Sequence, residues 1–259
     1  MLKYRGIQSG GKDMFKEYFV VGDIHGEFAM LEKLLSFWEP EKQKLLFIGD
    51  LADRGPQSRA CFEKVMQLVE EEGAICLRGN HEQMLLNFLN QPGDYIGNYF
   101  LNGGGVTIRS FLGNETDLRI DPFQLADKLR REYPKLLPFI QSLPLYHEWE
   151  KYLFVHAGVD LEKKDWKETD PKEFYWIRDP FHNGHNHTGK TIVFGHTPTF
   201  YLHGQTKNAN IWMKDHKIGI DGGAVYGGVL HGLVLAQSGI VDHYGIEKQN
   251  NLLQVNHYL

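Results

Sequence analysis

The sequence has little cysteine, no excess of positive charge and no long apolar run, and each shortage excludes a class of protein. Cys61 and Cys76 are the only cysteines among 259 residues, too few for a disulfide scaffold, so we expect a reducing, cytoplasmic compartment. The 28 Lys and Arg against 33 Asp and Glu give a net charge of −5, which excludes a basic protein that coats nucleic acid. No signal peptide or run of about eighteen apolar residues is visible, so we expect no membrane partner.

The composition is otherwise that of an ordinary globular protein. Hydrophobic residues make up 42% and charged residues 24%, so the chain can bury a core. No repeat, low-complexity tract or linker divides the sequence. We therefore predict a single domain over residues 1–259.

Strand and helix patterns alternate in the N-terminal part. An apolar run at Tyr18–Val21 precedes Glu27–Trp38, where apolar residues recur at helical spacing. The same order follows twice, with strands at Leu45–Ile48 and Ala74–Leu77 and helices at Ser58–Glu72 and Glu82–Asn90. This alternation predicts an α/β fold with a partly parallel sheet.

The pattern changes after this alternation. Residues 91–143 carry many Gly and Pro between short helical pieces such as Phe123–Glu132, so we predict a helical insertion over the rim of the active site. Strands are then expected at Leu153–Val155, Ile192–Phe194 and Ile218–Ile220, followed by a hairpin of Val229–Ala236 and Ile240–Tyr244 through Ser238-Gly239.

Five apolar strands each end in a short polar motif. The motifs are GDIHG at 22–26, GDLADRG at 49–55, GNHE at 79–82, HAG at 156–158 and GHT at 195–197. In α/β sheets, ligands bind in the crevice beyond the carboxyl ends of the strands, where these motifs should meet. Their glycines permit tight turns and a close approach of the backbone.

The motifs supply oxygen and nitrogen donors without a thiolate. Such a set suits Mn²⁺, which we favour, or Fe or Zn²⁺ in a catalytic site. Six donors are too many for one open ion, whereas two divalent metal ions about 3.5 to 4 Å apart, bridged by a carboxylate, would use them all. Each motif alone is equally typical of a polar loop or a helix cap, but five together favour a metal centre. The donors are Asp23, His25, Asp50, Asn80, His156 and His196.

Taken in order, the five motifs resemble the signature of the phosphoprotein phosphatase branch of the calcineurin-like metallophosphoesterases. They are most similar to small bacterial serine/threonine phosphatases and to diadenosine tetraphosphatases, and the resemblance covers residues 18 to about 231. It implies a four-layer αββα sandwich with two mixed sheets. It also implies that Asp23, His25 and Asp50 bind the first metal ion and that Asp50, Asn80, His156 and His196 bind the second, with Asp50 bridging.

Two arginines are candidates for binding the substrate phosphate, together with Asn80. Arg54 lies in the same loop as Asp50, and its guanidinium group can bind phosphate oxygens through paired hydrogen bonds. Arg178 follows Trp176, and small bacterial phosphatases have a similar Trp-x-Arg element. The alternative for Arg178 is a surface arginine beside Asp179.

A histidine and an aspartate are candidates for proton transfer. His81 directly follows Asn80, so it must lie near the metals, where an imidazole can protonate the leaving oxygen. Asp53 can orient this imidazole, as carboxylates do in other histidine-based sites. The resemblance assigns the pair the same roles.

These residues predict a two-metal phosphoesterase in which a metal-bridging hydroxide attacks phosphorus directly while His81 protonates the leaving alcohol. The expected partner is a phosphorylated protein carrying phosphoserine or phosphothreonine, or a small phosphoester. One alternative is symmetrical hydrolysis of dinucleoside tetraphosphates, but many such relatives have a small apolar residue in place of Asp53. An inactive scaffold is another alternative, although scaffolds commonly lose ligands that this chain keeps. No pattern indicates the oligomeric state.

Several weaker features allow two interpretations. The histidines of residues 181–189 (His182, His185 and His187) form a third metal site or, as we favour, a polar loop. Tyr226 faces substrate or belongs to a plain turn, and residues 102–105 form a lid or a break between helices. We interpret Arg78 as a structural ion-pair partner and both cysteines as inert.

The insertion should also decide how open the site is. An open wall would let a phosphorylated side chain reach the metals, and the many glycines and prolines favour this case. Should Tyr95, Tyr99 or Phe100 fold over the pocket instead, their rings would stack on a nucleoside base and hold a dinucleotide.

Overall fold

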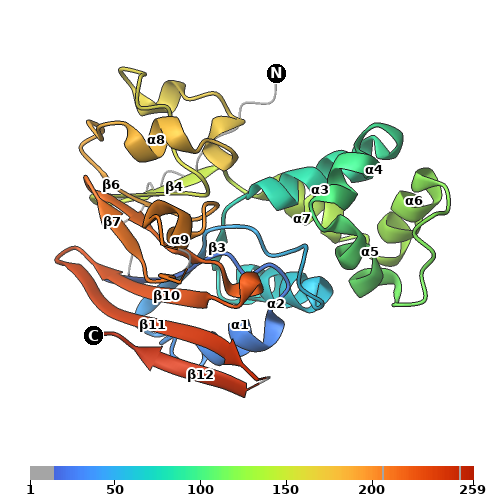
Figure 1. Ribbon diagram of the computed structural model, residues 1–259, viewed down its shortest axis with the longest axis horizontal. Coiled ribbons are helices and arrows are strands. Elements are labelled where there is room, and N and C mark those ends of the chain that lie inside the picture. Colours follow the sequence, from blue (N-terminus) through green and yellow to red (C-terminus); the bar gives the residue numbers. More distant parts are fainter. Residues whose placement is uncertain (1–14, 206, 251) are drawn as a thin grey trace.

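Two mixed β-sheets form the centre of the molecule. A computed structural model describes residues 15–205, 207–250 and 252–259, and Figure 1 shows its arrangement. The strands of the first sheet are β1 (Glu17–Val21), β2 (Gln43–Phe47), β3 (Ile75–Cys76), β9 (Asp221–Gly222), β10 (Val229–Ala236), β11 (Gly239–Gln249) and β12 (Leu252–His257). Their order is β12-β11-β10-β1-β2-β3, with β9 paired to β10 beside this path. Strands β1, β2 and β3 are parallel, whereas β10 runs antiparallel to β1.

The second sheet has the order β4-β5-β6-β8-β7. Its strands are β4 (Tyr146–Trp149), β5 (Tyr152–Val155), β6 (Thr191–Phe194), β7 (Trp212–Lys214) and β8 (Lys217–Gly219). Strands β5, β6 and β8 are parallel, and the edge strands β4 and β7 are antiparallel to their neighbours. The parallel strands of both sheets supply the ends at which the polar motifs stand.

Helices lie outside both sheets and in a separate group at one side. They are α1 (Phe28–Leu35), α2 (Ser58–Glu71), α3 (Asn80–Asn90), α4 (Pro92–Leu101), α5 (Gly104–Leu112), α6 (Pro122–Glu132), α7 (Leu136–Ser142), α8 (Asp179–Asn183) and α9 (Thr199–Leu202). Short 3₁₀ turns are η1 (Trp166–Glu168), η2 (Glu173–Tyr175) and η3 (Ala224–Tyr226). In Figure 1, α4, α5 and α6 extend away from the sheets. These helices belong to the predicted insertion, residues 91–143, which therefore lies beside the sheets.

Alternating side chains along β1 build two cores at once. Tyr18 and Val20 join the core between the sheets, whereas Phe19 and Val21 join the core beneath α1 and α2. A third core covers the outer face of the second sheet. The order of layers is therefore helix, sheet, sheet, helix, which confirms the predicted αββα sandwich. The third core is closed by Trp166, Phe174 and Phe181 from the turns and α8.

The predicted strands and helices all occur, and the misses are short or at an edge. Strands β4, β7, β9 and β12 were not predicted. Strands β7 and β9 have three and two residues, too few to show an apolar alternation, and Leu252 at the start of β12 is 71% exposed. Helix α1 ends at Leu35, before the predicted Trp38. Helix α3 begins at Asn80 rather than Glu82, so a predicted metal ligand opens the helix.

The turn at residues 102–105 is a break between helices. Asn102 ends α4, and Gly103 adopts a left-handed conformation with φ of 100° before α5 begins. A Cβ atom at Gly103 would lie 2.8 Å from the backbone nitrogen of Arg54. The turn is thus packed against the loop that carries Asp53 and Arg54, and only glycine fits there.

The sequence predicted no membrane span and two inert cysteines. Among residues 15–205, 207–250 and 252–259, no helix is long and apolar enough to cross a membrane. Cys61 and Cys76 are free and buried. Burial raises the pKa of both thiols, which agrees with their interpretation as inert.

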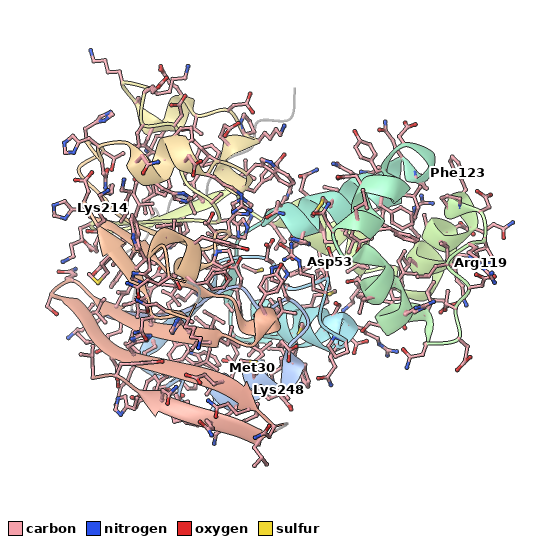
Figure 2. The ribbon with its side chains drawn as sticks, viewed as in Figure 1. Met30, Asp53, Arg119, Phe123, Lys214 and Lys248 are labelled. Carbon is pink, nitrogen blue, oxygen red and sulfur yellow. The ribbon has the colours of Figure 1, made fainter. Side chains whose placement is uncertain are left out.

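The core between the sheets should dominate stability. Phe154 is fully buried there, whereas Phe123 on α6 is 59% exposed at the outer end of the helical group (Figure 2). Phe154→Ala should lower the free energy of unfolding by about 3 to 5 kcal/mol, because it removes a buried ring and leaves a cavity. Phe123→Ala should change it by no more than about 0.5 kcal/mol. Urea denaturation measures both, and similar losses would contradict this assignment of the cores.

Candidate active site

The polar motifs converge where the strands end. Asp23 follows β1, Asp50 follows β2, and His156 and His196 follow β5 and β6. Asn80 opens α3 just after β3. The structure therefore brings the six predicted donors together from both sheets, and each is at most 6% exposed. Parallel pairing explains this, because it places the carboxyl ends of neighbouring strands at one edge.

Backbone strain is concentrated in the same loops. Non-glycine residues rarely adopt positive φ angles, which cost about 1 to 3 kcal/mol each and persist only where the surroundings enforce them. Five such residues lie at the site: His25, Asp50, Asp53, Arg54 and His196, with φ angles of 46°, 53°, 72°, 69° and 65°. This clustering indicates that the loops are held in position for a function.

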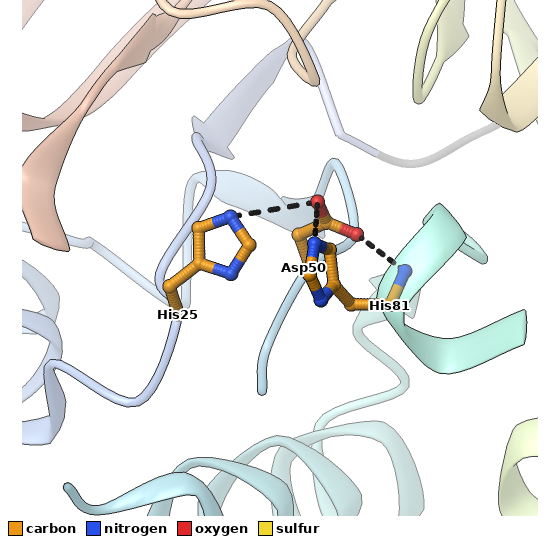
Figure 3. A group of neighbouring side chains, drawn as sticks. All are labelled: His25, Asp50 and His81. Carbon is orange, nitrogen blue, oxygen red and sulfur yellow. Dashed lines mark hydrogen bonds and ion pairs between the residues drawn. The ribbon is translucent and has the colours of Figure 1, made fainter. Parts of the chain in front are cut away.

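The first group of donors surrounds one oxygen of Asp50. The Nε2 atoms of His25 and His81 lie 3.6 Å and 4.0 Å from Asp50 Oδ2 (Figure 3). His25 donates from Nδ1 to the carbonyl of Ala52 at 2.8 Å, which directs Nε2 toward the site. Burial and the neighbouring His81 hold the pKa of His25 well below its ordinary value, so the imidazole is neutral and can bind a metal.

The second group contacts the same oxygen of Asp50. His156 Nε2 is 3.4 Å from Asp50 Oδ2 and 3.1 Å from Asn80 Oδ1, and Nδ1 of the same ring donates to the carbonyl of Ile48 at 3.0 Å. Ligand atoms of Asp50, His156 and His196 lie within 4.8 Å of one another. Asp50 thus belongs to both groups, as a bridging carboxylate would, although the first group contains His81, the predicted acid, and not the predicted ligand Asp23.

The buried carboxylates of Asp50 and Asp23 have pKa values shifted by their neighbours. Burial by itself would raise the pKa of Asp50, but the nearby His156, His81 and His25 lower it below its ordinary value. Burial raises the pKa of Asp23, and the carboxylates of Asp221 and Asp50 raise it further. Two carboxylates this close are poorly compensated without added positive charge.

Two buried ligand atoms without hydrogen-bond partners show that the site has room in its bonding for metal ions. Asp23 Oδ1 and His196 Nε2 have no hydrogen-bond partner, although buried polar atoms are nearly always paired. Both belong to predicted ligands. Imidazoles, carboxylates and an amide oxygen form the donor chemistry of a catalytic Mn²⁺, Fe or Zn²⁺ centre, so the residues beside Asp50 fit divalent ions.

The predicted acid and its partner are in direct contact. His81 Nδ1 and Asp53 Oδ2 lie 2.6 Å apart, and the exposed fractions of the two side chains are 1% and 0%. His81 is on the first turn of α3, and its backbone nitrogen donates to Asp50 Oδ1 at 3.1 Å. The imidazole is therefore oriented by Asp53 and stands beside the metal ligands.

Each of the two arginines contacts or lies next to a different predicted ligand. Arg54 Nη1 contacts the His25 ring, and its guanidinium group lies 5.6 Å from the centre of the Tyr226 ring. Arg178 donates from Nη1 to Thr197 Oγ1 at 2.7 Å, next to His196. Asp179 is exposed and points to solvent. Arg178 is exposed, as the alternative of a surface arginine beside Asp179 expects, but its contact with Thr197 also places it next to the predicted ligand His196.

Other sequence interpretations have mixed outcomes. His185 pairs with Asp215 and His187 contacts the carbonyl of Lys163, so the described residues do not join the 182–187 histidines into one metal site. Arg78 donates to the Gln141 carbonyl and the Gln83 amide, which is a structural role.

The aromatic rings of the insertion do not cover the site. Tyr99 is buried in the core, and Tyr95 and Phe100 pack against that core. Exposed rings come instead from the residue after η2, from α9 and from η3. Trp176 lies 6.0 Å from the His196 ring, and Trp176, Tyr201 and Tyr226 are 39%, 67% and 58% exposed. We call these three residues the aromatic wall.

Sequence reasoning missed three supporting residues. Glu82 accepts from the backbone nitrogens of Asp50, Leu51 and Gly79 at 2.8, 2.8 and 2.9 Å, and its place three residues after Gly79 at a helix start was the available signal. Asp221, whose charge helps to raise the pKa of Asp23, directly follows the predicted strand Ile218–Ile220. The predicted ligands were found from the same position after a strand. Thr107 reaches Asp53 from the insertion, and no local pattern indicates that contact.

An αββα sandwich that gathers these donors at its strand ends defines a metal-dependent hydrolase of phosphate esters. The chain belongs to the calcineurin-like phosphoesterase family, whose family model matches residues 18–228. It is 32% identical over 222 residues to serine/threonine-protein phosphatase 1 of Salmonella typhimurium, covering 83% of this chain and 90% of the relative.

Relatives with another named activity are equally similar. The chain is 29% identical over 252 residues to the asymmetrical bis(5'-nucleosyl)-tetraphosphatase PrpE of Anoxybacillus flavithermus, covering 83% of this chain and 89% of the relative. A crystal structure of a candidate diadenosine tetraphosphatase matches with a TM-score of 0.59 and 19% identity, covering 95% and 96% of the two chains. This structural likeness supports the fold. The family is therefore established, and the substrate is not decided by these likenesses.

Replacing single ligands should separate the two ion sites. Asp50→Asn should reduce binding of both ions, because Asp50 belongs to both donor groups, whereas His25→Ala should reduce mainly one. His185→Ala, an exposed loop histidine, is the matched control and should keep full metal content. Mass-spectrometric metal counting after saturation with Mn²⁺ measures this. A wild-type protein that holds at most one ion contradicts the two-metal arrangement.

Proposed function

We propose that this protein is a two-metal phosphoesterase that hydrolyses phosphomonoesters, with phosphoserine and phosphothreonine on proteins as the leading substrates. One observation carries the proposal. The hydrogen-bonded pair of His81 and Asp53 stands within 4.0 Å of Asp50, the carboxylate shared by both donor groups. A scaffold that only binds metals would not need an oriented acid at this place.

The ligands and arginines would divide the work of binding. Asp23, His25 and Asp50 would hold one ion and Asp50, Asn80, His156 and His196 the other; when bound, the ions would neutralise phosphate charge and lower the pKa of water. Arg54 and Arg178 would fix the phosphate oxygens from two sides, with Asn80 beside them. Held in advance by the strained loops, these groups need little rearrangement when charge develops.

The leaving group requires a proton, and His81 is placed to supply it. His81 Nδ1 is held by Asp53, so Nε2 faces the predicted ligands, and in the imidazolium form this atom would carry the transferable proton. As a hydroxide oxygen forms its bond to phosphorus, the P–O bond to the leaving group breaks, and its electron pair stays on the leaving oxygen, which takes the Nε2 proton and departs as a neutral alcohol. Water then returns a proton to the imidazole.

The openness of the site supports a phosphorylated side chain as substrate. Tyr99 belongs to the core, and Tyr95 and Phe100 pack against it, so these rings are engaged with the core rather than available to stack on a base. An insertion without a covering ring would let a phosphorylated side chain reach the metals. The relative named as a serine/threonine phosphatase supports the same choice.

Asymmetrical hydrolysis of dinucleoside tetraphosphates is the second candidate. The sequence alternative was symmetrical cleavage, whereas the named relatives are asymmetrical enzymes, so the candidate is restated in that form. The aromatic wall favours it, because Trp176 flanks a predicted ligand and Tyr226 lies against Arg54. Exposed rings beside phosphate-binding groups are suited to stacking on a base.

Removing the acid should depend on the leaving group. His81→Asn should lower kcat by roughly 10² to 10⁴ on an alkyl phosphate, the usual range for a general acid, while metal content stays normal. The loss should be smaller on p-nitrophenyl phosphate, because its leaving group needs little protonation. Steady-state kinetics on both substrates measure this, and equal losses would remove the acid role.

A substrate comparison separates the two candidates. Phosphoserine or phosphothreonine peptides should be hydrolysed with kcat/KM at least comparable to that for diadenosine tetraphosphate. A preference for the dinucleotide above about a hundredfold, some 2.7 kcal/mol, reverses the choice. Trp176→Ala is the diagnostic variant. It should leave the peptide reaction nearly unchanged, whereas a selective loss on the dinucleotide would assign the aromatic wall to base stacking.

A further inference from the structure

The helical insertion reaches the acid through one hydroxyl group. Thr107 of α5 is fully buried, and its Oγ1 donates to Asp53 Oδ1 at 2.6 Å. The other oxygen of Asp53, Oδ2, faces His81 at 2.6 Å. Thr107, Asp53 and His81 therefore form a continuous chain of hydrogen bonds from the insertion to the ligand shell, and Figure 2 places Asp53 where the helical group meets the sheets.

Thr107 also holds the backbone of Asp53. The Asp53 nitrogen donates to Thr107 Oγ1 at 2.9 Å and to Ser58 Oγ at 3.1 Å. Asp53 has a φ of 72°, a conformation that non-glycine residues keep only when their surroundings enforce it. The single hydroxyl of Thr107 therefore secures both the main chain and the carboxylate of this residue.

The surroundings leave Asp53 few other positions. Gly103 of the same insertion packs against the backbone of Arg54, the next residue in the loop. Tyr99 of α4 is buried nearby, and burial followed by the negative charge of Asp53 raises its pKa well above the ordinary value. The insertion thus contacts the loop at several points, but Thr107 is the contact that reaches both ends of Asp53.

We propose that Thr107 is a positioning residue, through which the helical insertion sets the orientation of the His81 acid. The proposal rests on the proposed function, because it requires His81 to protonate the leaving group. Without the Thr107 hydroxyl, Asp53 Oδ1 loses its donor and the strained main chain loses one acceptor. The carboxylate can then turn, and the Nε2 proton of His81 no longer points at the leaving oxygen.

Three variants test this role. Thr107→Val keeps the branched shape and removes the hydroxyl, and Thr107→Ser restores the hydroxyl. Thr169→Val is the matched control, because Thr169 is also buried, accepts from the Asp160 nitrogen at 3.0 Å and donates to the Trp166 carbonyl at 2.6 Å. It should lose comparable stability without touching Asp53.

Thr107→Val should lower kcat on an alkyl phosphate by roughly 10- to 100-fold, the range for a residue that orients another. The loss on p-nitrophenyl phosphate should be much smaller, with KM and metal content unchanged. Thr107→Ser should recover most of the activity, and Thr169→Val should retain it on both substrates. Equal losses on the two substrates, or the same selective loss in Thr169→Val, would overturn the proposal.

A double-mutant cycle separates this proposal from the proposed function. In a His81→Asn background, Thr107→Val should cause little further loss of kcat, because the proton donor is already absent. A selective loss in His81→Asn without one in Thr107→Val overturns the Thr107 role alone. An unselective loss in His81→Asn overturns the acid role and the Thr107 role together.

Discussion

The arrangement of the site depends on one buried carboxylate. Asp50 is 2% exposed and lies within 4.0 Å of three imidazoles, so its carboxylate interacts with neighbouring side chains rather than with water. A buried charge is tolerated only with such partners. Because Asp50 belongs to both donor groups, each ligand loop must end at a fixed distance from it, and the two sheets hold these ends in place.

The loops bear a cost that other parts of the fold offset. Left-handed residues are unfavourable, yet His25, Asp50 and His196 all adopt this conformation. Glu82 holds the Asp50 loop through three backbone nitrogens, although burial and the charge of Asp50 raise its own pKa. Apolar cores above and below the sheets supply the stability that keeps these loops in one conformation.

The two parts of the molecule contribute differently to the chemistry. The sheets present the metal ligands, and their outer loops carry the arginines and the aromatic wall. The helical insertion provides no predicted ligand, but it packs Gly103 and Thr107 against the loop of Asp53. Metal binding and orientation of the acid therefore rest on separate segments, which meet at residues 53 and 54.

The sequence alone predicted the ligand set, because each donor stands in a short motif after an apolar strand and this pattern is local. It also determined the parallel strands and the long helices, whose apolar periodicity is visible in short windows. Only the tertiary structure decided which aromatic rings face solvent, since Tyr99 and Trp176 have similar local patterns but different neighbours. Likewise, Thr107 lies 54 residues from Asp53, and such a contact depends on how the insertion packs rather than on any nearby residue.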